Sequence, residues 1–113
     1  MRKDRDKLSD ILEAIENIEK YTARGKDNFF KDELVRVWII YHIQIIGESA
    51  ANLSVELRNN TPDIPWPDIT YMRNVLVHQY FGIDLNQIWD TVTYDLPDLK
   101  RKVRELLEKM QGD

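Results

Sequence analysis

The stretch from residue 35 to residue 46 constrains the fold most, because it is apolar on every side. It predicts a helix at about residues 29–57, in which successive side chains are turned by about 100°. At that spacing no polar face remains. The apolar side chains are Val35, Val37, Trp38, Ile39, Ile40, Tyr41, Ile43, Ile45 and Ile46.

A helix of this kind must be covered on both sides. In a chain of 113 residues, the remaining helices can cover one side of it. A second copy of the chain is the simplest cover for the other side, so we expect a homodimer with this helix near the interface. The alternative is that it is the central helix of a monomer.

One acidic residue, Glu48, falls within this apolar segment, four residues after Gln44 and on the same face. A carboxylate buried there needs a partner. Arg73 is the candidate, and the alternative is a purely structural pair with any nearby arginine.

The rest of the chain predicts further helices and no strand. A helix is predicted at about residues 4–21 from side chains that recur at helical spacing: Leu8, Ile11, Leu12, Ile15, Ile18 and Thr22. Pro67 suits the first turn of a helix at about 67–80. Asp84 and Gln87 predict a capping box for a helix at 85–95, and Pro97 begins or kinks a last helix that extends to about Met110. A proline-rich loop occupies 59–67. We therefore expect one all-α domain over residues 1–113, a bundle of four to five helices.

Composition narrows the functional classes. The chain has no cysteine, which excludes disulfides and thiolate metal sites, and it has no apolar run of about 18 residues that could span a membrane. Its charged N-terminus is not followed by an apolar signal core, so a cytoplasmic protein without a targeting segment is expected. The net charge of −4 argues against a general nucleic-acid coat but not against a local phosphate site. The most basic run, residues 100–104, is interpreted as a solvated helix face, with phosphate contact as the alternative.

The polar residues Arg73, Asn74, His78 and Tyr80 surround a short apolar run. An arginine can bind a phosphate through forked hydrogen bonds, and a histidine with a pKa near about 6.5 can transfer protons close to neutral pH. On a regular helix, however, Arg73 and His78 lie about 140° apart. Either the helix unwinds near His78, or two copies of the motif meet across a two-fold axis.

The arrangement Arg73-Asn74-x-x-x-His78 resembles the signature of the HEPN superfamily, and its continuation to Tyr80 resembles the HepT toxins. Further segments in the family's order support the resemblance over roughly residues 6–107. They are Ile46-Gly47-Glu48-Ser49-Ala50, Pro65-Trp66, Tyr80-Phe81-Gly82, and Trp89 through Asp95-Leu96-Pro97.

The resemblance implies a metal-independent RNA endonuclease, the toxin of a toxin–antitoxin pair, with an active cleft built by both protomers. Arg73 and His78 would be catalytic, Asn74 and Glu48 would support them, and Tyr80 would position substrate. It also implies a nucleotidyltransferase antitoxin that adenylylates Tyr80. No metal or cofactor is expected. Because the 2′-hydroxyl would be the nucleophile, the products would end in 2′,3′-cyclic phosphate and DNA would not be cut.

Each residue also has a purely structural interpretation. His78 can be a helix C-terminal histidine favoured by the helix dipole, Tyr80 can pack at an interface, and His42 is interpreted as a satisfied core or interface histidine. The rival function is a non-catalytic helical module that binds a nucleotidyltransferase subunit.

Overall fold

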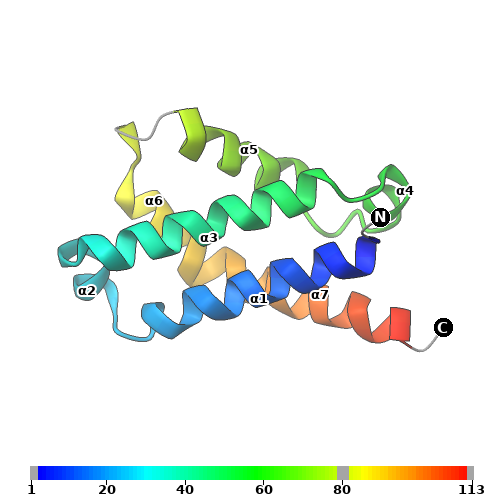
Figure 1. Cartoon of the computed structure of the whole chain (residues 1–113), viewed down its shortest axis with the longest axis horizontal. Coiled ribbons are helices and arrows are strands. Elements are labelled where there is room, and N and C mark those ends of the chain that lie inside the picture. The colour runs from blue at the N-terminus through cyan, green and yellow to red at the C-terminus, as the bar shows by residue number, and fades with distance from the viewer. Residues whose placement is uncertain (1–2, 79–81, 112–113) are drawn as a thin grey trace.

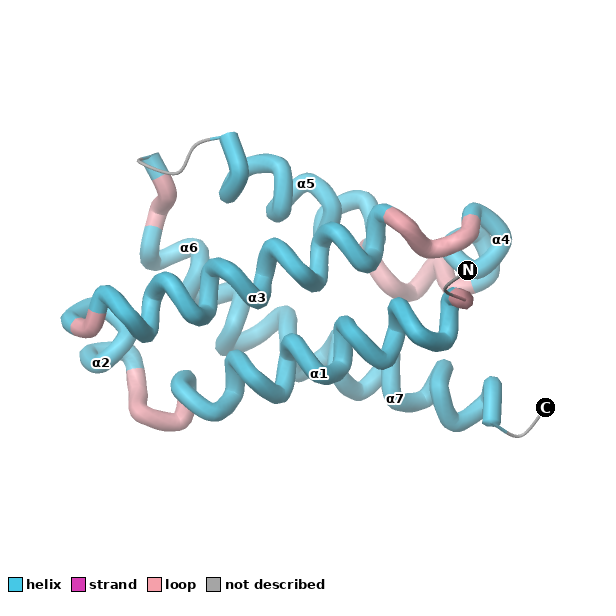
Figure 2. Tube along the Cα trace, in the orientation of Figure 1, coloured by secondary structure: helices cyan, strands magenta, loops and turns pink. Residues whose placement is uncertain are grey.

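Four long helices run along the molecule: α1 (Asp4–Thr22), α3 (Glu33–Ala51), α5 (Trp66–His78) and α7 (Leu96–Gln111). In the computed structural model, which describes residues 3–78 and 82–111, successive long helices run in opposite directions (Figure 1). The short helices α2 (Lys26–Lys31), α4 (Val55–Asn60) and α6 (Leu85–Asp90) lie in the connections between them. The described residues contain helices and loops but no strand (Figure 2), so the all-α prediction is confirmed.

The α3 helix is the centre of the arrangement, with α1 packed on one side and α5 on the other, while α7 packs against α1. The face of α1 predicted to be apolar is its buried face: Leu8, Ile11, Ile15 and Ile18 are each at most 1% exposed. Burial of one such side chain contributes about 1.5–3 kcal/mol. The periodicity of α1 therefore specifies which of its faces meets the rest of the molecule.

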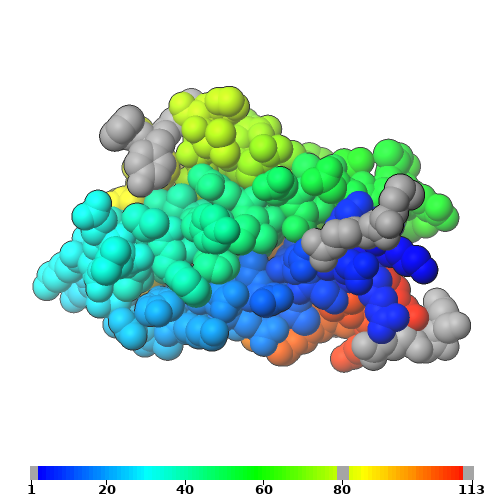
Figure 3. All heavy atoms as spheres, viewed as in Figure 1, coloured from blue at the N-terminus to red at the C-terminus, as the bar shows by residue number. Residues whose placement is uncertain are grey.

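The α3 helix is covered on only part of its circumference. Its buried residues include Val35, Ile39, Ile43 and Ile46, whereas another stripe of the same helix faces solvent. That exposed stripe consists of Leu34 (80% exposed), Val37 (46%), Trp38 (37%) and Tyr41 (57%). Figure 3 shows α3 open on the near face of the molecule, beside α1. Despite this apolarity, neither α3 nor any other described helix is long and apolar enough to cross a membrane.

The helix predicted at residues 29–57 is divided, so its predicted bounds were wrong. Asp32 has an extended backbone and its carboxylate accepts hydrogen bonds from the backbone N–H groups of Leu34 and Val35, which starts α3 afresh. At the other end Ser54 caps α4, with its hydroxyl accepting from the N–H of Leu57. Side chains that satisfy the free N–H groups of a helix start favour a new helix over continuation of the old one.

The helix predicted at residues 85–95 is not separate from the last helix. A π-helical turn, Thr91–Asp95, joins α6 to α7, and the N–H of Leu96 donates to the carbonyl of Thr91, five residues back. Pro97 has no N–H to offer the carbonyl of Thr93, which is the bond that a regular helix would need. Pro97 therefore lies in the first turn of α7 without breaking the chain's helical course.

The loop before α5 is fixed by buried polar contacts. The indole N–H of Trp66 donates to the Thr61 hydroxyl at 2.9 Å, and that hydroxyl donates to the carbonyl of Leu57 at 2.8 Å. Trp66 is only 2% exposed. These bonds tie the start of α5 to α4, so the proline-rich loop holds the helix that carries the polar motif.

Candidate functional site

Arg73 lies where α5 crosses α3 at close range. A Cβ atom added to Gly47 of α3 would be 2.2 Å from the Cβ of Arg73 and 3.2 Å from the carbonyl oxygen of Ile69. Both helices can approach this closely only because residue 47 has no side chain. Gly47 therefore fixes the position of the Arg73 backbone relative to the core.

The Arg73 side chain is half-buried, and its Nε is buried without a hydrogen-bond partner among the described residues. An unpaired buried donor of this kind costs about 1–3 kcal/mol, more for a charged group. Because this Nε has almost no contact with solvent, an acceptor from outside the described chain would reach it only after a local rearrangement or would bind the other nitrogens of the guanidinium. A phosphate or carboxylate oxygen would supply that acceptor.

Glu48 does not supply the expected partner. It is exposed, so the expectation that its carboxylate is buried was wrong and it needs no counter-ion. The described part of the chain contains no hydrogen bond or ion pair between Glu48 and Arg73, and the Glu48 backbone carbonyl accepts from the Asn52 side chain instead. Gly47, the neighbour of Glu48, is the residue of α3 that meets Arg73.

Asn74 and His78 are both exposed and lie four residues apart on the outer side of α5. The helix remains α-helical up to His78, so the unwinding considered for this point does not occur within the described residues. Regular geometry therefore keeps Arg73 and His78 about 140° apart within one chain. The structure brings Asn74 and His78 to one face and does not bring Arg73 to them; Tyr80 lies outside the described residues.

Hollows lie on both sides of α5. One, of about 410 Å³, lies between α5 and α7 over isoleucines of α3, and its rim carries Asp68, Asp95 and Asp98 with Lys102. The other, of about 600 Å³, lies between α4 and α5 and includes Asn74 of the motif. Two residues that the sequence analysis missed, Arg58 and Tyr71, line the same hollow.

The spacing of Tyr71 from the polar motif could have identified it in the sequence as a candidate site residue. It precedes Asn74 by three residues and His78 by seven, which places all three on one face of a helix. It is also 69% exposed, which is high for a large aromatic side chain in an all-α protein. No comparable signal marked Arg58, which comes close to α5 only through the path of the intervening loop.

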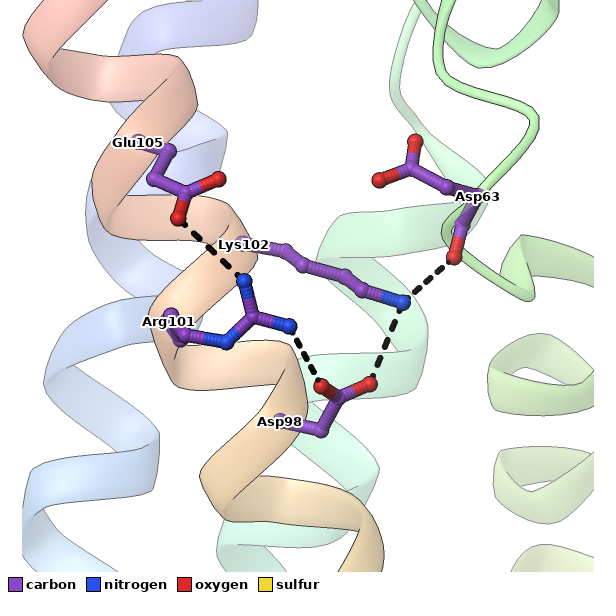
Figure 4. Close-up of polar contacts among 5 residues, drawn as sticks. All are labelled: Asp63, Asp98, Arg101, Lys102 and Glu105. Carbon is purple, nitrogen blue, oxygen red and sulfur yellow. Dashed lines mark hydrogen bonds and ion pairs between the residues drawn. The ribbon is translucent and has the colours of Figure 1, made fainter.

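Three cations of the basic run of α7 form internal ion pairs, so the solvated-face interpretation was only partly right: the side chains of Lys100 and Lys102 are just 20% and 18% exposed. Lys100 pairs with Glu19 at 2.6 Å, and Arg101 pairs with Asp98 and Glu105. Lys102 contacts Asp98 at 3.1 Å and donates to the carbonyl of Asp63 at 2.7 Å (Figure 4). These cations link parts of the molecule and are not gathered at the polar motif.

Asp98 is the acceptor at the centre of this network. Hydrogen bonds from Arg101 and Lys102 hold the pKa of the Asp98 carboxyl below its ordinary value. The hydrogen bond with Asp98 is in turn the main cause that raises the pKa of Arg101 above its ordinary value. Asp98 therefore stays ionised and pairs with both Arg101 and Lys102, of which Lys102 lines the hollow between α5 and α7.

His42 is a satisfied core histidine, as expected. It is 6% exposed, and its Nδ1 is 2.7 Å from the carbonyl oxygen of Trp38, which requires the proton on Nδ1. Its ring also lies against the Trp38 ring, with centroids 4.3 Å apart. Across the described ranges, no group of three or more His, Asp or Glu side chains is arranged to hold a metal ion.

The comparisons with known proteins agree on one family. The model of the family described as "Ribonuclease HepT-like" matches residues 11–106. A protein of Thermococcus cleftensis named "Probable ribonuclease HepT" is 39% identical over 106 residues, which cover 93% of this chain and 96% of the relative. A "Putative RNase" of Caldanaerobacter subterraneus subsp. tengcongensis is 34% identical over 96% of this chain and 98% of its own length.

A longer relative comes from Methanocaldococcus jannaschii and is named "Gamma-glutamylcyclotransferase and putative RNase". It is 40% identical over 112 residues, 97% of this chain, and the chain spans about half of that relative's length. No solved structure matches the chain at a significant level. The family match covers most of the sequence, including the helix with Arg73, Asn74 and His78, and the chain therefore belongs to the HepT-like ribonuclease family.

Proposed function

We propose that this chain is a metal-independent endoribonuclease that acts as the toxin of a toxin–antitoxin pair. The observation that carries the proposal is Arg73. It is fixed at the α3–α5 crossing by Gly47, and its buried Nε lacks an acceptor among the described residues. Within a ribonuclease family, the phosphate of an RNA strand is the acceptor that suits this position.

RNA supplies its own nucleophile. The 2′-hydroxyl loses its proton to a base and attacks phosphorus, the bond to the 5′-oxygen breaks, and an acid protonates that oxygen. His78 serves as base or acid, because its imidazole is exposed and can both accept and donate a proton. Arg73 stabilises the charge that develops on the phosphate, and Asn74 orients His78 or the phosphate. Glu48, which is exposed near the crossing, supports the site without a direct ion pair to Arg73.

The active cleft contains both protomers of a homodimer. One α5 helix presents Arg73 and His78 on different sides, so one protomer does not bring both to a single phosphate. The uncovered stripe of Leu34, Val37, Trp38 and Tyr41 on α3 supplies an apolar surface for the second copy. In the dimer, two copies of His78 can divide the roles of base and acid.

The cognate antitoxin is a nucleotidyltransferase that adenylylates Tyr80. An attached AMP would bring a negatively charged phosphodiester close to Arg73, where it would compete with the RNA phosphate, and its bulk would block the cleft. Expression without the antitoxin then arrests growth, and the His78→Ala variant does not.

Cleavage of an RNA with single-stranded segments by the purified protein in the presence of EDTA tests the proposal. Wild type cuts the RNA and leaves 2′,3′-cyclic phosphate ends. Arg73→Ala and His78→Ala each reduce the rate at least about 100-fold, which is the order expected for loss of a general acid–base group or an oxyanion donor. Circular dichroism verifies that both variants keep the wild-type helix content.

Arg104→Ala is the matched control, because Arg104 is an exposed arginine of α7 far along the chain from the motif. It should cut RNA at the wild-type rate. Strict dependence on Mg²⁺ with 5′-phosphate products would contradict the mechanism. A well-folded wild type that binds a nucleotidyltransferase but cuts no RNA would instead favour the non-catalytic module.

A further inference from the structure

The hollow between α4 and α5 differs in charge from the one on the other side of α5. Its lining contains one charged residue, Arg58, and no carboxylate. The hollow towards α7 has three aspartates, Asp68, Asp95 and Asp98, against the single cation Lys102. In a chain of net charge −4, the α4–α5 hollow is therefore a local surface that does not repel a polyanion.

Arg58 has an unused donor. Its Nε is buried and has no hydrogen-bond partner, and no ion pair of Arg58 occurs within residues 3–78 and 82–111. The basic residues of α7 contrast with this, since Lys100, Arg101 and Lys102 all contact acidic groups of the chain itself. A guanidinium held at the edge of a hollow without a carboxylate is suited to a phosphate group from outside.

Tyr71 supplies the second element of a nucleic-acid surface. It lines the same hollow and is 69% exposed. Single-stranded nucleic acids bind through bases that stack on exposed aromatic rings and phosphates that contact arginine. Asn74 of the motif also lines the hollow, and His78 lies one turn beyond it on the same face of α5. The hollow thus leads along α5 towards the proposed site of cleavage.

We infer that the α4–α5 hollow binds the single-stranded RNA that flanks the cleaved bond, with one base stacked on Tyr71 and one phosphate bound by Arg58. This inference rests on the proposed ribonuclease function and extends it to a binding surface outside the cleavage site. It also sets a substrate preference, because a base in a duplex is not free to stack on a protein side chain. The protein therefore selects unpaired RNA.

The test measures binding of a fluorescent, uncleavable 2′-O-methyl RNA octamer by anisotropy at several salt concentrations. Tyr71→Ala weakens binding about tenfold, whereas Tyr71→Phe, which keeps the ring, binds within about twofold of wild type. Arg58→Gln weakens binding and makes the negative slope of log K against log salt shallower by about 0.7, the value for one phosphate contact on a single strand. Arg58→Lys keeps the slope, since it keeps the charge.

Tyr94→Ala is the matched control, because Tyr94 is 71% exposed but lines the acidic hollow towards α7. It should bind the octamer as wild type does. Equal binding by wild type, Tyr71→Ala and Arg58→Gln overturns the inference, as does a wild type that does not bind the octamer. Cleavage of unmodified RNA by the same wild-type preparation is measured separately, so loss of the binding surface is distinguished from loss of the ribonuclease function.

Discussion

Arg73 owes its position to a missing side chain rather than to a salt bridge. The close contact with Gly47 fixes its Cβ, while its Nε remains buried and unpaired among the described residues. His78 differs, since it is exposed and accessible to solvent protons. The two residues therefore suit different tasks, one for binding a phosphate in a fixed place and one for proton transfer.

Tyr80 is the residue on which we expect the antitoxin to act. Incubation with the cognate nucleotidyltransferase and ATP should add one or more AMP masses to Tyr80 and abolish RNA cleavage. The Tyr80→Phe variant lacks the hydroxyl that would be modified, so it should gain no mass and resist inhibition. Intact-mass spectrometry and peptide mapping measure the result. Modification of Tyr71 or Tyr94 instead, or full inhibition without a change in mass, would contradict the assignment.

At the scale of the helices, the α3–α5 crossing controls the geometry of the motif. A side chain at residue 47 would meet the Cβ of Arg73 and the backbone of α5, neither of which can rotate away. The helix must then shift as a whole, and with it the motif. A substitution in α3 is thus expected to act on the activity of residues in α5.

Gly47→Ala should lower the free energy of unfolding by about 1–3 kcal/mol, the usual cost of overpacking, and should reduce RNA cleavage. In an uncrowded helix the same change would stabilise the protein by up to about 1 kcal/mol. The sign of the change in the free energy of unfolding therefore shows whether residue 47 is crowded. Urea denaturation measures it. Ser49→Ala, two residues further along α3, is the control and should stay within about 0.5 kcal/mol of wild type. A Gly47→Ala protein that is more stable than wild type would disprove the steric argument.

On the scale of the whole molecule, the exposed stripe of α3 is an apolar surface that the rest of the chain does not cover. Leu34, Val37, Trp38 and Tyr41 are exposed next to a tightly packed core. Trp38 is only partly free, because its indole N–H donates to the carbonyl of Asn17 at 2.9 Å. The outer edge of the stripe remains available to a second copy of the chain.

Light scattering at micromolar concentration should give twice the 13.5 kDa mass of one chain. Leu34→Glu and Tyr41→Glu each place a charge in the apolar stripe and should shift the protein towards monomer, with RNA cleavage falling in parallel. Tyr94→Glu, a change at a similarly exposed residue outside the stripe, should leave the mass unchanged. A monomeric wild type that still cuts RNA would show that one chain is sufficient.

The sequence by itself determined the all-α class, the buried face of the first helix and the residues of the motif. The spacing of Leu8, Ile11, Ile15 and Ile18 identified the buried face of α1, because helical periodicity depends only on near neighbours in the chain. The same regularity indicated that Arg73 and His78 lie on different faces of one helix. The α5 helix is indeed regular up to His78.

Only the tertiary structure decided how these elements meet. Glu48 is exposed, Gly47 rather than Glu48 meets Arg73, and Arg58 lines the hollow that contains Asn74. The physical reason is that burial and close approach depend on residues far apart in the chain. Local periodicity carries no information about those distances.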